Sequence, residues 1–163
     1  MKLCAFVLLF LTVTACNRAE KQSKQLGARI DSLEQKLANT YTPGFGEFMS
    51  GIQVHHAKLW FAGINANWEL ADFEIHEIME AIDDLQKFQP GRKEVSSLPM
   101  LNPALDSLNA AIRQKNLVQF KSSYTLLTNT CNNCHKAVDY PFNEVKIPDT
   151  PPFSNQVFEK RKE

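Results

Sequence analysis

The most regular hydrophobic pattern in this sequence leads into a pair of cysteines near the end of the chain. Its positions are separated by steps of three, four, three, four and three residues: Leu117, Phe120, Tyr124, Leu127, Cys131 and Cys134. Such spacing places side chains along one face of an α-helix. The pattern therefore predicts a helix from about residue 117 whose buried face carries both thiols into the core of the fold.

Three further segments have helical spacing of apolar residues, and no segment alternates in the manner of a β-strand. They cover about residues 43–62, 68–85 and 103–116. Thr42 before Pro43, and Asn102 before Pro103, each offer an N-cap side chain followed by proline at the first helical position. Each segment is therefore predicted to be an amphipathic helix that buries one face.

Together the four helices predict an all-α fold, an antiparallel four-helix bundle over residues 42–163, because short connections join the first helix to the second and the third to the fourth. The segment from Gln89 to Pro103 is the longest connection and is expected to be a loop. The acidic positions of the second helix are expected to lie mostly on its solvated face: Glu74, Glu77, Glu80 and Asp84.

The N-terminal stretch has the features of an export signal. Lys2 precedes an apolar run over residues 3–13, which is too short to span a bilayer as a helix. The four letters VTAC that end at Cys16 resemble the bacterial lipobox, and this resemblance implies a lipoprotein signal peptide over residues 1–15 and lipidation of Cys16. Asn17 in place of an aspartate then implies anchoring in the outer membrane, with the protein facing the periplasm.

Residues 16–41 are predicted to form a lipid-anchored tether and a short helical stalk. The stalk carries a narrow apolar stripe like the seam of a coiled coil, at Leu26, Ile30, Leu33 and Leu37. The stripe lasts less than two heptads. Formation of a homo-oligomer through the stalk is therefore one alternative, beside a stalk that stands alone or lies against the domain.

Only Cys131 and Cys134 of the four cysteines remain once Cys4 leaves with the signal and Cys16 is lipidated. With His135 they form the pattern C-x-x-C-H of covalent c-type haem attachment. On a helix, thiols at i and i+3 share a face and can meet the two vinyl groups on one haem edge, while the histidine becomes the proximal iron ligand. The sequence therefore predicts one covalent haem c.

Other interpretations of the cysteine pair remain open. A thioredoxin-like redox pair lacks its βαβ context here, and a zinc site lacks a second C-x-x-C. An exported C-x-x-C also tends to oxidise, so the third alternative is a non-haem envelope lipoprotein with a Cys131–Cys134 disulfide.

The segment that follows Val138 is rich in proline and cannot continue the helix. Its apolar residues are candidates for wrapping a haem edge: Pro141, Phe142, Ile147, Pro151, Pro152 and Phe153.

A helix bundle with a single C-x-x-C-H near the end of its last helix resembles the cytochrome c-prime family and its low-spin relatives. The match covers about residues 43–138 and rests on helix order and on the position of the motif. The resemblance implies that the haem lies inside the bundle, attached to the last helix, and that the distal residue lies on the first bundle helix, about three turns from its start. That family usually has a basic residue four positions after the haem histidine, where this chain has Asp139.

The residue on the distal side decides the function, because an open sixth position allows gas binding and a filled one favours electron transfer. Three turns from Pro43 lead to about residue 54, beside His55 and His56. End-to-end alignment of the first and last helices would instead favour Met49. We expect His56 as the distal ligand, because it shares a stripe with Met49, followed by His55 and then Met49; an open site remains an alternative.

The composition limits the classes of partner and reaction that are expected for this chain. Eighteen basic residues balance eighteen acidic ones, so no basic face for nucleic acid is expected. Neither of the glycine-rich phosphate-binding loops is present, and no nucleophile with a base partner can be identified, so an enzyme is not expected. The expected function is one-electron transfer to a redox partner protein by a periplasmic mono-haem c-type cytochrome tethered by its lipid. The alternative is a five-coordinate haem protein that binds nitric oxide or carbon monoxide.

Overall fold

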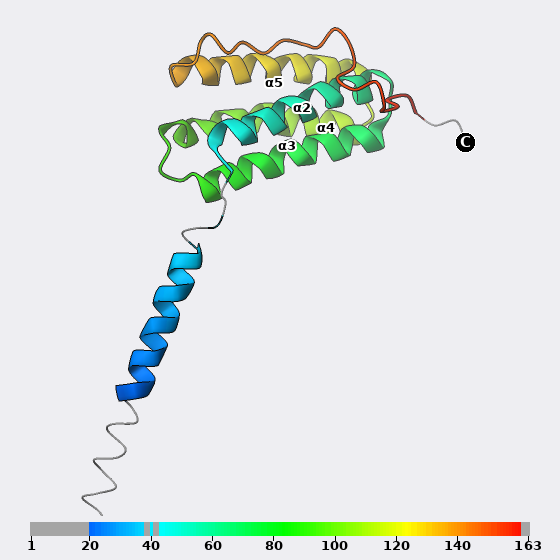
Figure 1. Cartoon of the computed structure of the whole chain (residues 1–163). Helices are drawn as coiled ribbons and strands as arrows, with labels where there is room; N and C mark the ends of the chain where they lie inside the picture. Colours follow the sequence, from blue (N-terminus) through cyan, green and yellow to red (C-terminus); the bar gives the residue numbers. More distant parts are fainter. Residues whose placement is uncertain (1–19, 38–39, 41–42, 161–163) are drawn as a thin grey trace, which may run out of the picture. The chain divides into compact units, whose positions relative to one another are not determined.

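The computed structural model describes residues 20–37, 40 and 43–160. The chain divides into two compact units, residues 1–42 and 43–163. All regular structure in the described residues is helical, and they contain no strand (Figure 1). The expected all-α class is therefore confirmed.

In the first unit, residues 20–37 form a helix and residue 40 lies in a bend. The side chains of its apolar stripe are between 48% and 74% exposed: Leu26, Ile30, Leu33 and Leu37. The predicted signal peptide and Cys16 lie outside the described residues. None of the described helices has the length and apolar character needed to cross a membrane.

The second unit begins with two long helices joined by a short turn. Helix α2 spans Phe45–Ile64 and α3 spans Trp68–Phe88. The expected start of α2 at Pro43 is wrong. Gly44 is the N-cap, because its carbonyl oxygen accepts the first helical hydrogen bonds, and no side chain caps the helix there. Thr42 lies outside the described residues. The side chain of Asn67 caps α3 by accepting a hydrogen bond from the amide of Leu70 at 3.3 Å.

The connection after α3 is more ordered than the expected loop. It contains a 3-10 helix, η1, over Lys93–Leu101, which runs directly into α4 at Asn102–Arg113. Leu98 and Leu101 are buried, so the segment contributes to the core and takes helical structure although Pro99 interrupts its sequence. Because η1 continues into α4, Leu101 and not Asn102 occupies the N-cap position.

Helix α5 spans Leu117–Ala137 and starts with Asn116, whose side chain accepts from the amide of Gln119 at 3.1 Å. Helix α2 packs against α3 and α5, and α4 packs against the same two helices (Figure 1). One hydrophobic core fills the space between them and includes Phe120 and Tyr124. The predicted stripe of α5 is confirmed as its buried face, except that Leu117 is 36% exposed at the start of the helix and Cys131 is only partly buried.

One acidic residue of α3 does not face solvent as expected. Glu74 is completely buried, with Oε2 2.7 Å from His55 Nδ1 and Oε1 2.6 Å from Lys58 Nζ. Position 74 lies beside Ala71 and Ile75 on the buried face of α3. His55 and Lys58, the two partners of Glu74, both belong to α2. The prediction of a solvated face is therefore wrong for Glu74.

The described residues after α5, 138–160, contain no helix, and the chain returns along α5 (Figure 1). Phe158 is buried and its ring centroid lies 5.8 Å from that of Phe61. Ile147 packs against the core. The other residues proposed to wrap a haem edge are instead exposed: Pro141, Phe142, Pro151, Pro152 and Phe153. Their prolines and turns keep the backbone on the surface. Contact of these residues with a haem edge stays a prediction.

The packing of α2 against α5 depends on Gly63. A Cβ atom at this position would lie 2.0 Å from Cζ of Phe120, whereas one at Gly51 of the same helix would meet nothing within 4 Å. We expect Gly63→Ala to lower the free energy of unfolding by roughly 1–3 kcal/mol through overpacking. Gly51→Ala should raise it by about 0.5–1 kcal/mol through helix propensity. Urea unfolding measures both; equal effects of the two substitutions would contradict this packing.

Candidate functional site

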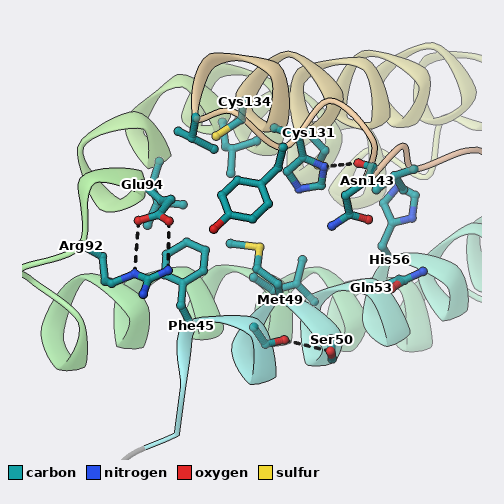
Figure 2. A pocket seen from close by; sticks show the side chains of 18 residues that line it. Phe45, Met49, Ser50, Gln53, His56, Arg92, Glu94, Cys131, Cys134 and Asn143 are labelled. Atoms are coloured by element: carbon teal, nitrogen blue, oxygen red, sulfur yellow. Dashed lines mark hydrogen bonds and ion pairs between the residues drawn. The ribbon is translucent and has the colours of Figure 1, made fainter.

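A cavity of about 410 Å³ opens between α2, η1, the end of α5 and the segment after it (Figure 2). Its volume falls in the range of roughly 300–1,000 Å³ that is usual for ligand pockets. The lining is mainly apolar, with a few polar groups. It includes Phe45, Met49, Ile52, Gln53, His56, Arg92, Glu94, Leu98, Leu101, Cys131, Cys134, His135, Val138, Tyr140, Asn143 and Val145.

The structure brings both predicted attachment cysteines to this cavity. Cys131 and Cys134 lie one turn apart on α5, and both are free thiols. Burial raises the pKa of Cys131 to about 12 and also raises that of Cys134. At neutral pH both groups are therefore protonated thiols, in contrast to the low-pKa thiolate of a thioredoxin-type redox pair.

His135 lines the same cavity from the last turn of α5. Its Nδ1 lies 2.6 Å from the backbone carbonyl oxygen of Asn143 (Figure 2). Because a carbonyl only accepts hydrogen bonds, Nδ1 carries the proton in the neutral ring and Nε2 carries the lone pair. This tautomer is the one that a metal ligand binding through Nε2 requires.

His56, the predicted distal ligand, also lines the cavity and is only 4% exposed. However, both of its ring nitrogens have partners on α5: Nδ1 lies 2.9 Å from the Tyr124 hydroxyl and Nε2 lies 2.9 Å from Thr128 Oγ1. The Tyr124 hydroxyl donates to the His56 carbonyl at 2.7 Å, so Nδ1–H donates to Tyr124. Burial lowers the pKa of His56 to about 4, and the imidazole is neutral at pH 7.

Met49 and His55 lie in different places. Met49 extends from α2 into the cavity, toward Cys131 and Cys134 on α5 (Figure 2). His55 is not part of the cavity lining, because it bonds to buried Glu74 on α3. Of the three distal candidates, the structure therefore places His56 and Met49 at the cavity and His55 away from it.

An ion pair in the cavity wall was not predicted. Glu94 is 5% exposed and receives Arg92 through two contacts, Nη2 to Oε1 at 3.0 Å and Nε to Oε2 at 3.2 Å. A hydrogen bond from its own backbone amide and the Arg92 guanidinium hold the pKa of Glu94 below its usual value despite burial. The only sequence signal was an Arg-x-Glu spacing inside a segment expected to be a loop.

The described residues contain no group of three or more His, Cys, Asp or Glu side chains that could hold a bare metal ion. No protein-family model matches the sequence, and neither a curated protein nor a solved structure shows a significant match to it. The site is therefore interpreted from its own chemistry.

Proposed function

We propose that this chain is a mono-haem c-type cytochrome that transfers single electrons. The observation that carries the proposal is that Cys131, Cys134 and His135 line one apolar cavity, where hydrogen bonding leaves Nε2 of His135 free. A haem c needs two thioether anchors and an axial nitrogen on the same face of a helix, and this triplet supplies that donor set. In this proposal helices α2–α5 are a four-helix bundle that carries the cofactor on its last helix.

The surroundings of the triplet also suit the group. The lining is mainly apolar, which suits a porphyrin, and the two thiols are protonated and not joined in a disulfide, the form from which thioether bonds are made. When bound, the haem supplies an iron that cycles between the ferric and ferrous states. The protein holds and orients this iron and determines which state is favoured.

Met49 is the better candidate for the sixth ligand. Its thioether extends into the cavity, opposite the helix that carries His135, and it forms no polar contact with any other described residue. Ligation by His56 would require it to give up its bonds to Tyr124 or Thr128 in a buried site. We therefore propose His135 and Met49 as the axial pair, a change from the order expected from the sequence.

The proposal also includes the lipid anchor, the redox partner protein and the homo-oligomer that the sequence suggested. Lipidation of Cys16 would tether the protein to the outer membrane on its periplasmic side, where a redox partner protein would approach it. The exposed stripe of the helix over residues 20–37 supports a homo-oligomer as a possible assembly. Because basic and acidic residues are equal in number, a nucleic-acid partner is not part of the proposal.

The test is the absorption spectrum of residues 17–163, produced in a host competent in haem c attachment and reduced with dithionite, before and after carbon monoxide. The proposal expects a covalent haem with sharp low-spin bands that the gas does not change. A broad high-spin spectrum that shifts with carbon monoxide would replace electron transfer by gas binding. A colourless protein with a Cys131–Cys134 disulfide would overturn the haem assignment.

A further inference from the structure

Asn132 is one of the two spacer residues in the C-x-x-C-H motif, and its side chain binds the segment after α5. The side chain of Asn132 donates from Nδ2 to the carbonyl oxygen of Val145 at 2.8 Å and accepts from the amide of Val145 at 2.8 Å. Two reciprocal bonds to one residue fix both the position and the orientation of the backbone there. We call this pair the Asn132–Val145 clamp.

The backbone between α5 and the clamp forms a short loop held at both ends. At its start the amide of Tyr140 donates to the carbonyl oxygen of His135 at 2.8 Å, and the amide of Asn143 closes a turn on Tyr140 at 3.1 Å. At its end the clamp holds Val145. The Asn143 carbonyl that accepts from His135 Nδ1 at 2.6 Å lies between these two fixed points.

The clamp is thus the side-chain contact that sets the position of this carbonyl. Residues 141–160, the part of this segment that the structure describes, contain no helix or strand that could hold it through regular backbone bonding. Without the clamp, the nearest restraint on the C-terminal side of Asn143 would be the packing of Ile147 against the core, four residues further along the chain. The bond to His135 Nδ1 would then be lengthened or lost.

A carbonyl that accepts from Nδ1–H makes the opposite nitrogen of the imidazole a stronger electron donor. Stronger donation stabilises the ferric form of a bound iron more than the ferrous form, and so lowers the reduction potential. The same bond fixes the tautomer in which Nε2 is free to bind.

We infer that Asn132 is a positioning residue for the proximal histidine: through its clamp on Val145 it holds the Asn143 carbonyl on His135 Nδ1 and thereby lowers the reduction potential of the bound haem. This inference rests on the proposed function. It assigns a role to a spacer position of the C-x-x-C-H motif, which the attachment chemistry itself leaves undefined.

The chain provides a matched control in the next residue. Asn133 is the other spacer of the motif, is exposed, and forms no side-chain hydrogen bond with any residue that the structure describes. Asn133→Ala removes the same side chain from the same helical turn as Asn132→Ala. The two substitutions therefore differ mainly in the clamp.

The experiment compares haem-loaded wild type, Asn132→Ala and Asn133→Ala by redox titration. At the midpoint potential of the wild type, Asn132→Ala is expected to have a ratio of reduced to oxidised protein about tenfold higher, at the lower end of the roughly 10–100-fold effects on metal affinity or activity that follow loss of a supporting bond to a metal ligand. Asn133→Ala should titrate like the wild type. A rise in the ratio of reduced to oxidised protein distinguishes the proposed role from simple loosening of the segment. Loosening that admitted water would favour the more highly charged ferric form and would lower this ratio.

Hydrogen exchange at the amide of Val145 provides the second readout, with exchange expected to be about tenfold faster or more in Asn132→Ala only. An unchanged or lowered ratio in Asn132→Ala, or the same rise in both variants, would overturn the inference. If no variant takes up haem, the proposed function and the role for His135 fail together. Faster exchange at Val145 in Asn132→Ala would then show that the clamp exists and anchors only the tail.

Discussion

In the proposed haem protein, replacement of Met49 by alanine is expected to turn a reduced protein that does not respond to carbon monoxide into one that binds one molecule of the gas per haem. The thioether of Met49 extends from α2 into the cavity, opposite the helix that carries His135. Its removal would vacate the sixth position and leave space for a diatomic ligand. His56 would not replace it, because Tyr124 and Thr128 hold both of its ring nitrogens.

The measurement is an absorption titration of the reduced protein with carbon monoxide, together with the reduction potential. Loss of an axial methionine should also lower the potential, since this ligand favours ferrous iron. Saturable binding by Met49→Ala, with none in the wild type, is the expected result.

Two histidine variants are the controls for Met49→Ala. His56→Gln keeps polar atoms for Tyr124 and Thr128 and should leave the low-spin spectrum unchanged. His55→Gln alters a side chain outside the cavity and should do the same. If His56→Gln opened the iron to carbon monoxide and Met49→Ala did not, His56 would be the ligand and the original order would stand.

The helices could be predicted because each buries one face, and a buried face leaves a periodic pattern in the sequence. The same pattern placed Cys131 and Cys134 on the inner side of α5, where the structure has them. The starts at Trp68 and Leu117 were also predictable, since asparagine caps both. These features depend on neighbours within about one helical turn.

The features that were missed depend on contacts between distant residues. His56 meets Tyr124 across 68 positions of the chain, so no count along α2 could show that its nitrogens are occupied. The 3-10 helix η1 forms where Leu98 and Leu101 fill the core, although its proline suggested a loop. The link from Asn132 to Val145 involves an asparagine side chain and a backbone, which leave no pattern.

The largest loss of stability is expected from substitution of Glu74, which lies on α3 and contacts two residues of α2. This carboxylate is completely buried and contacts His55 at 2.7 Å and Lys58 at 2.6 Å. Glu74→Ala would leave the Lys58 ammonium, whose side chain is 14% exposed, without its partner. Removal of one member of a buried pair costs about 3–5 kcal/mol, because a desolvated charge remains.

Glu77→Ala is the matched control for Glu74→Ala, because it makes the same change one turn further along α3. The Glu77 side chain is 36% exposed and lies 3.9 Å from His55, so its loss should cost less than about 1 kcal/mol. Any effect of helix propensity is shared by the two variants and cancels in the comparison.

A third variant tests the mechanism of the loss at Glu74. Glu74→Leu combined with Lys58→Met removes both members of the ion pair and fills the space with apolar atoms, which is often close to neutral. We therefore expect the double variant to be more stable than Glu74→Leu alone, by urea unfolding at pH 7. Equal losses in these two proteins, or a loss in Glu74→Ala no larger than in Glu77→Ala, would mean that this buried pair does not stabilise the packing of α2 against α3.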